Sequence, residues 1–460
     1  MTIYVNNLLS ATAADVTGKP TPTRAWQWLR NGTAISGANS STYTVVEADL
    51  AANLSVSQIE TNLGGIDTAT STALGPVSIF GVNSLFANDE EGAWYAPSDL
   101  STLFQDSLGT TPVTTAGQPV GLMLDKSKGL VLGVELTTNG NFATASDWTL
   151  AADTQISGGN LSTTTTVAGE IAAQVVSIEA GKTYKIQYTV LSTNGEIIVP
   201  RLSGQSGSSG PASTTTGTFT GYILAVSDIN KFAFNVSSSG LTATISDVSV
   251  QELPGNHATQ STAAARPTYQ TGAGLHWLAF DGVDDAMATG VVDFTGTSKT
   301  DVFCGVYKES DAGLGAIVMN GTNGNEGGGT FALYAPHNNT SRKWAWSVSG
   351  TGQNFLSVND LAAPSTVIMS GLFDISNALG ATGRIKARLN GAEQTVFNDN
   401  INGGSASAMK SDTIRIGVQE TGSGHFYGRL YGLIIRGAQS TASQINETET
   451  YMAARTGVTL

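Results

Sequence analysis

Three aspartates lie close together in one short segment and could bind a cation. The segment is Phe280-Asp-Gly-Val-Asp-Asp285, so Asp281, Asp284 and Asp285 directly follow a strand-like stretch. Carboxylate oxygens are the ligands that Ca²⁺ prefers. Aspartate is equally suited to accept backbone hydrogen bonds in a tight turn. Two interpretations therefore stay open, a structural calcium site and a turn held by its own aspartates, and the sequence favours the turn.

Two pairs of aromatic residues are candidates for sugar binding, because the C–H faces of sugars stack on exposed rings. In a Lys-Trp-Ala-Trp-Ser segment, the alternation of a strand places Trp344 and Trp346 on one face. His425 and Tyr427 form the second pair, just before another strand-like run. Each pair has a structural alternative. The tryptophans could fill a sandwich core, and His425 and Tyr427 could pack at its rim.

Residue patterns that support catalysis are missing from the sequence. Retaining and inverting glycosidases need paired carboxylates, and some carry them in a Glu-x-Asp-x-x-Glu strand. Glu47-Ala-Asp49 begins like this pattern, but its last carboxylate is missing because position 52 is Ala. There is no Gly-x-Ser-x-Gly elbow, no phosphate-binding loop and no zinc-ligand spacing among the four histidines. Cys304 has no His nearby and suits a buried position on a strand. We therefore expect a non-enzymatic protein without a cofactor, unless calcium is bound.

Charged residues are scarce for the length of the chain. Lys, Arg, Asp and Glu make up 13% of the 460 residues, against roughly 25% in an average soluble domain. Solvated helix faces are usually rich in such residues, whereas Thr, Ser, Asn and Gly suit strands and turns. We predict an all-β protein built from several β-sandwich modules. The net charge of −14 argues against nucleic acid as a partner, because binding to phosphates requires a basic face.

Targeting signals are not visible in the sequence. No run of 18 apolar residues occurs, so we expect no membrane insertion. The N-terminal residues lack the basic and apolar segments of a secretory signal. One cysteine cannot form an internal disulfide, which favours folding in a reducing cytosol.

Residues 1–80 resemble the immunoglobulin-like modules of bacteria and phages. Alternation in the segment before Asn31 predicts a strand whose Trp28 fills the core, and Asn31-Gly32 predicts a tight turn after this strand. The strings that carry the resemblance are Arg30–Ala38 and Ser41–Val45. The resemblance implies a small β-sandwich over these residues.

Residues 81–134 resemble a segment that recurs in structural proteins of tailed bacteriophages. The matching strings are Gly92–Ser107 and Gly109–Ser127. We interpret the segment as a compact connector with a helix of one or two turns that begins at Pro97. Its acidic cluster, Asp89-Glu90-Glu91, could bind a cation, but a solvated turn is the favoured interpretation.

The remaining sequence resembles two lectin-like folds. Residues 135–253 resemble a jelly-roll carbohydrate-binding module, which typically closes on a strand like Ala243–Glu252. Residues 254–460 resemble a laminin-G or concanavalin-A-like sandwich. The resemblance rests on Gly274–Asp285 near its start and on Thr413–Gly417 and Phe426–Ile435 at its C-terminal end. A capping-box pattern at Thr441 and Gln444 predicts a final helix from Thr441 to Ala454.

The resemblances imply a structural virion protein of a tailed phage. We expect a fibre, spike or capsid-surface decoration, made in the host cytoplasm and displayed on the virion surface. Its expected partners are other virion proteins, further copies of itself, with a trimer assumed by analogy with fibres, and glycans of the host surface. The alternatives are a receptor-binding lectin that acts mainly through glycan recognition and, less favoured, a polysaccharide hydrolase.

Overall fold

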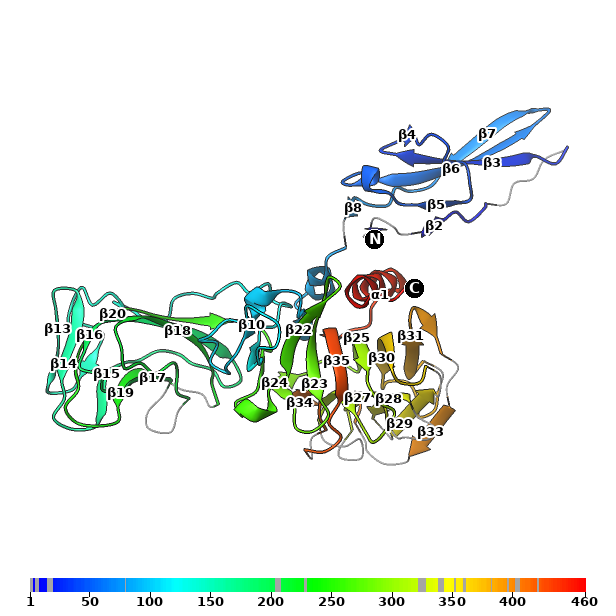
Figure 1. The fold of residues 1–460 in the computed structure, drawn as a ribbon. Helices are drawn as coiled ribbons and strands as arrows, with labels where there is room; N and C mark the ends of the chain where they lie inside the picture. The colour runs from blue at the N-terminus through cyan, green and yellow to red at the C-terminus, as the bar shows by residue number, and fades with distance from the viewer. Residues whose placement is uncertain are drawn as a thin grey trace. The chain divides into compact units, whose positions relative to one another are not determined.

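A computed structural model gives the fold of the chain and divides it into two compact units. The first unit comprises residues 1–84 and 441–447, and the second comprises residues 85–440 and 448–460. The described residues are 3–4, 8–14, 20–78, 80–202, 208–226, 230–321, 328–337, 343–350, 353–358, 361–381, 383–394, 397–401, 406–419 and 422–460. Strands dominate both units, as Figure 1 shows, so the predicted all-β class is confirmed.

The first unit is a small sandwich around Trp28. Its strands are β1 (Ile3–Tyr4), β2 (Leu8–Ser10), β3 (Thr23–Arg30), β4 (Thr33–Ala34), β5 (Thr42–Thr44), β6 (Leu54–Asn62), β7 (Gly65–Thr70) and β8 (Val77–Ser78). The sheet order is β4-β3-β6-β7, and β2 with β5 and β1 with β8 form two-stranded pairs. Trp28 is buried and stacks on Tyr43. Asn31 and Gly32 both have positive φ, which is the geometry of the tight hairpin turn that the sequence predicts.

Residues 149–253 of the second unit form two facing sheets (Figure 1). One sheet has the order β12 (Thr149–Leu150), β15 (Gly169–Gln174), β19 (Phe232–Val236) and β17 (Ile198–Leu202). The other has the order β13 (Thr154–Ser157), β14 (Asn160–Thr164), β20 (Thr242–Leu253), β16 (Thr183–Thr193) and β18 (Gly217–Leu224). A separate apolar core lies between them, with Phe142, Trp148, Tyr188 and Phe234 among its rings.

A larger sandwich fills the rest of the second unit. Its first sheet has the order β10 (Leu103–Phe104), β11 (Leu122–Met123), β21 (Ala258–Thr259), β24 (Met287–Asp293), β34 (Ser411–Ile416), β26 (Ala316–Asn320), β27 (Phe331–Tyr334), β28 (Trp344–Ser349), β29 (Gln353–Val358) and β33 (Phe397–Ile401). Its second sheet has the order β22 (Thr268–Gly272), β23 (Leu275–Asp281), β35 (Tyr427–Arg436), β25 (Lys299–Lys308), β30 (Ser365–Asp374), β31 (Ile385–Leu389) and β32 (Ala392–Glu393), while β9 (Gly92–Tyr95) also pairs with β35.

The segment that the sequence marks as a connector is part of this larger sandwich. Strand β9 pairs with the C-terminal half of β35, and β10 and β11 extend the other sheet by pairing with β21. The helix predicted from Pro97 is reduced to a 3-10 turn at Leu100–Thr102. It stops there because Leu103 and Phe104 enter the sheet as β10. Residues on both sides of the jelly-roll module thus build one sandwich.

One α-helix, α1 (Ala442–Thr456), is present among the described residues, beside 3-10 turns at Glu47–Asp49, Val82–Phe86, Leu100–Thr102 and Ala263–Ala265. The predicted capping box is confirmed, since the Thr441 N–H donates to Gln444 Oε1 and the Gln444 N–H donates to Thr441 Oγ1. The described part of the chain contains no helix that is long and apolar enough to cross a membrane.

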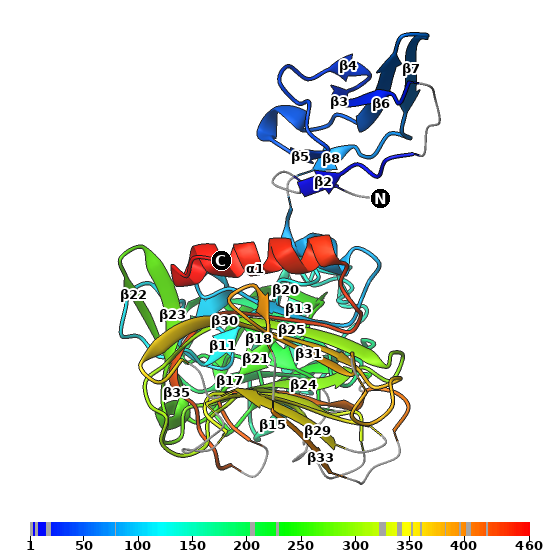
Figure 2. The same cartoon turned by 90° about the vertical axis from the view of Figure 1, so that its right-hand side faces the viewer.

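The C-terminal half of α1 packs on the sheet that contains β25 and β35 (Figure 2). Gly305 and Gly432 lie opposite each other on these strands. A Cβ at Gly305 would come within 2.5 Å of the Thr456 side chain, and one at Gly432 within 3.3 Å of the Met452 sulfur. The two glycines therefore provide the space in which Met452, which is fully buried, contacts the sheet.

Candidate functional site

The structure brings two of the predicted groups together at one edge of the larger sandwich. Strands β23 and β35 pair antiparallel with Asp281 opposite Tyr427. The acidic turn, residues 281–285, therefore lies beside the start of β35. Gly282 has a φ of +75°, and a Cβ there would lie 2.7 Å from the Tyr427 Cβ. Only glycine allows this close approach, and we call the acidic turn with His425 and Tyr427 the rim site.

Backbone hydrogen bonds define the acidic turn. Asp281 Oδ1 accepts the N–H groups of Val283 at 2.8 Å, Asp284 at 3.3 Å and Asp285 at 3.4 Å. Asp285 Oδ2 accepts the N–H of Asp281 at 2.9 Å. These contacts are those of a turn held by its own aspartates, the interpretation that the sequence favours.

The same three carboxylates are close enough to share one cation. One ligand oxygen from each of Asp281, Asp284 and Asp285 lies within 4.8 Å of the others. Asp281 and Asp284 are exposed, and Asp285 is buried. Burial raises the pKa of Asp285 to about 6, the Asp281 and Asp284 charges add to this rise, and backbone hydrogen bonding and His425 oppose it. An all-oxygen set suits calcium, and calcium binding here stays a prediction.

Tyr427 is the most accessible ring of the rim site. Its side chain is 50% exposed, and no other Trp, Tyr or Phe of the chain is classed as exposed where the structure describes burial. His425 is half-buried, and its Nε2 lies 3.1 Å from the Gly422 carbonyl oxygen. The Tyr427 ring can therefore contact a ligand, while His425 is held against its own loop.

The structure contradicts the prediction that Trp344 and Trp346 bind a sugar. Both rings are fully buried in the core of the larger sandwich. The indole of Trp344 donates to the Leu361 carbonyl at 3.1 Å, and that of Trp346 donates to the Ser370 carbonyl at 2.9 Å. Buried rings with satisfied N–H groups offer no face to a sugar, so the core interpretation is correct.

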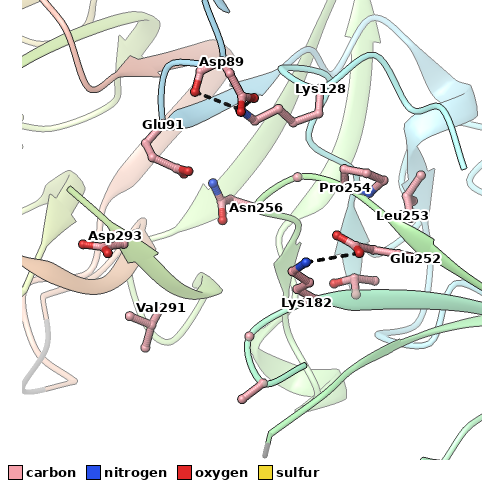
Figure 3. Close-up of a pocket in the computed structure, with 14 residues that line it drawn as sticks. Asp89, Glu91, Lys128, Lys182, Glu252, Leu253, Pro254, Asn256, Val291 and Asp293 are labelled. Atoms are coloured by element: carbon pink, nitrogen blue, oxygen red, sulfur yellow. Dashed lines mark hydrogen bonds and ion pairs between the residues drawn. The ribbon is translucent and has the colours of Figure 1, made fainter. Parts of the chain in front are cut away.

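Sequence reasoning missed a polar cleft in the second unit, which Figure 3 shows. Its volume is about 390 Å³, within the range of roughly 300–1,000 Å³ that is typical of small-molecule sites. Its charged and amide side chains come from distant parts of the sequence: Asp89, Glu91, Lys128, Lys182, Glu252, Asn256 and Asp293. The one sequence signal was the acidic cluster at residues 89–91.

Each acid of that cluster has a different environment. Asp89 pairs with Lys128 at 2.5 Å, and Glu90 pairs with Arg436 at 2.6 Å. Glu91 lines the cleft without an ion pair to any described residue. Burial raises the pKa of the Glu91 carboxyl, partly offset by the charge of Lys128. Asp89 and Glu91 are exposed, as the favoured interpretation of a solvated turn expects, whereas Glu90 is partly buried.

Asp125 holds the wall of the cleft in place. Its carboxylate is fully buried and accepts the N–H groups of Trp94 at 2.7 Å, Ser127 at 2.8 Å and Asn256 at 2.7 Å, together with the Ser127 hydroxyl at 2.7 Å. The Asn256 amide then donates to the Gly92 carbonyl at 2.7 Å. The cleft wall is therefore preorganised by hydrogen bonds.

No protein-family model matches the sequence, and no curated protein matches it. Among solved structures, a Ruminococcus gnavus sialidase CBM40 bound to sialyllactose aligns at 13% identity and a TM-score of 0.25, over 34% of this chain and 83% of its own. The receptor-binding domain of botulinum neurotoxin D aligns at 10% identity and a TM-score of 0.25, over 43% and 50%. A Trypanosoma rangeli sialidase aligns at 8% identity and a TM-score of 0.30, over 93% and 82%. These scores do not place the chain in any of those families.

Proposed function

We propose that this protein is a non-enzymatic virion protein of a tailed phage that binds host-surface glycans through the rim site. The observation that supports glycan binding most directly is the exposed Tyr427 ring beside three carboxylates. Sugar-binding surfaces combine an aromatic face, which contacts the C–H groups of a pyranose, with polar groups that accept its hydroxyl protons. The rim site offers both within a few residues.

Each group of the rim site has a distinct task in this proposal. The Tyr427 ring contacts the apolar face of one sugar residue. The exposed carboxylates of Asp281 and Asp284 accept sugar hydroxyls, either directly or around a calcium ion that they help to bind. The turn hydrogen bonds hold the Asp281 carboxylate and the backbone of Asp284, so the Asp281 side chain loses little freedom when a glycan binds.

The virion part of the proposal is supported by sequence resemblance. The phage-type strings Gly92–Ser107 and Gly109–Ser127 provide strands β9, β10 and β11 of the larger sandwich. We propose a fibre, spike or capsid-surface decoration on the virion surface, assembled with other virion proteins and as a homo-oligomer. A label on the C-terminus should appear on purified particles in electron micrographs, and particles without label would contradict this assignment.

Glycan binding is tested with variants of Tyr427. Replacing the ring by Tyr427→Ala should weaken binding to a responsive glycan on an array by about tenfold or more. Tyr427→Phe is the matched control, because it keeps the ring and should retain most of the binding. Equal binding by Tyr427→Ala and the unmodified protein would show that the rim site is not the glycan site.

The absence of catalysis is tested separately. Host envelope polysaccharide incubated with the protein should release no reducing ends above the buffer level. A time-dependent release, abolished by heat denaturation, would replace the proposed binding role by hydrolysis.

A further inference from the structure

The polar cleft carries an excess of negative charge that its own lysines do not neutralise. Lys128 pairs with Asp89, and Lys182 pairs with Glu179 at 2.9 Å and with Glu252 at 3.3 Å. Both ammonium groups are therefore already matched by carboxylates. Glu91 and Asp293 also line the cleft, and neither forms an ion pair within the described part of the chain.

The pKa values of these two carboxylates shift in opposite directions. The pKa of the Asp293 carboxyl is lowered because it accepts hydrogen bonds from the Thr295 hydroxyl at 2.7 Å and the Thr295 N–H at 2.9 Å. The pKa of the Glu91 carboxyl is raised, mainly by burial and also by the charges of Asp89 and Asp293, while the charge of Lys128 and the Asn256 amide oppose this rise. Figure 3 shows Glu91 and Asp293 on one side of the cleft and Lys182 with Glu252 on the other.

The cleft also contains the uncharged groups that a sugar needs. Asn256 provides an amide between the charged groups, and its backbone is fixed by Asp125. Val291, which is 59% exposed, adds an aliphatic contact at the edge. No aromatic ring is found among the described residues that line the cleft, so recognition by these residues depends on charge and hydrogen bonds rather than on stacking.

We propose that this cleft is a second ligand site, which binds a saccharide with a free, protonated amino group through Glu91 and Asp293. The ammonium group would lie between the two unpaired carboxylates, and Asn256 and the Lys182–Glu252 pair would bind hydroxyls of the same sugar. This inference rests on the proposed role in glycan recognition and extends it from the rim site to an amine-specific site.

Glucosamine and N-acetylglucosamine provide the decisive comparison, because acetylation removes the charge and leaves the ring. Binding to the full chain is measured by calorimetry at low ionic strength and at pH 7. Glucosamine oligosaccharides should bind at least about tenfold more tightly than their N-acetylated counterparts, and added salt should reduce the difference. Equal binding of both, or binding of neither, would overturn the proposal.

Isosteric variants locate the site. Glu91→Gln and Asp293→Asn should each weaken binding of the glucosamine oligosaccharide by about tenfold or more. Glu393→Gln, which removes an exposed carboxylate on β32, is the matched control and should change nothing. If the cleft variants bind like the control, the cleft does not bind the amine.

Two further measurements separate this site from its rivals. Tyr427→Ala should leave the preference for glucosamine intact, and its loss in that variant would assign amine binding to the rim site instead. Calcium chloride alone should not bind in a way that Glu91→Gln abolishes, since such a result would make the cleft a cation site. Retained amine selectivity would uphold the cleft even if Tyr427→Ala had no effect on glycan arrays.

Discussion

The substitution Asp125→Asn tests how the cleft wall is held. One oxygen of the new amide can still accept the N–H groups of Trp94 and Ser127. The other position becomes an NH₂ group that faces the Asn256 N–H. In the unmodified protein this N–H donates to Asp125 Oδ2 at 2.7 Å. A buried donor that loses a charged acceptor costs about 2–3 kcal/mol. The Ser127 hydroxyl can rotate and accept instead of donating, so it adds little to this cost.

The cost should be local, and amide hydrogen exchange measures it segment by segment. A change of about 2–3 kcal/mol corresponds to a rise of roughly 30- to 150-fold in the opening constant of the affected amides. Peptides that cover residues 254–257 should lose protection by this factor, whereas peptides from β16 should not change. Unaltered exchange at residues 254–257 would refute the idea that Asp125 fixes the cleft wall.

Two further substitutions and one labelling experiment probe buried charges and the single thiol. Burial raises the pKa of Asp301 to about 7, against roughly 3.9 in an unfolded chain, so folding favours the protonated acid and this contribution is lost between about pH 4 and pH 7. Asp301→Asn should therefore have the same free energy of unfolding as the unmodified protein near pH 4 and exceed it by up to about 4 kcal/mol at pH 8, as measured by urea denaturation. A difference that stays constant between these pH values would contradict the raised pKa of Asp301. Arg388→Met removes the cation that pairs at 2.8 Å with Glu449, whose side chain is 1% exposed, and leaves the Ser370 hydroxyl as a donor to this carboxylate. We expect a loss of about 3–5 kcal/mol in the free energy of unfolding in urea, and no loss would mean that solvent reaches Glu449. Burial raises the pKa of the Cys304 thiol, so a thiol reagent should label it only after denaturant is added, and rapid labelling of the native protein would contradict this burial.

Local patterns in the sequence predicted local structure well. The capping box of α1 and the positive-φ hairpin turn at Asn31-Gly32 are present, because both depend on residues within one turn of the chain. The all-β class followed from composition, which reflects how solvent-facing positions are filled. The boundaries at residues 80, 134 and 253 stay predictions.

Long-range pairing was beyond the reach of the sequence. Strands β10 and β11 have two residues each, too few to show an alternating pattern, and they exist because β21 offers a free edge. Alternation correctly placed Trp344 and Trp346 on one face, but it cannot tell whether that face is covered. Every residue of β28 is buried, because both sides of the strand are covered.

The cleft could not be predicted for the same reason. Its carboxylates Glu91 and Asp293 are separated by some two hundred positions and meet only because β9 and β24 belong to one sandwich. The rim site was easier to predict, because its two parts, the acidic turn and the pair of His425 and Tyr427, were each recognised as short motifs. Their juxtaposition, however, depends on the pairing of Asp281 with Tyr427 across β23 and β35.

The way the jelly-roll module joins the larger sandwich determines how easily the whole module can be replaced by another. The chain leaves the sandwich after β11 and returns at β21, and the two crossings are tied together by the Gly133 N–H, which donates to the Glu252 carbonyl at 2.8 Å. A module whose two ends meet in this way is grafted like a long loop, and the sheets beneath it keep their registers when the graft is replaced. One wall of the cleft, with Lys182 and Glu252, would be replaced together with the module, while Glu91 and Asp293 would remain in the larger sandwich. Replacing this module on an unchanged larger sandwich would therefore change the ligand preference of the cleft without a new fold.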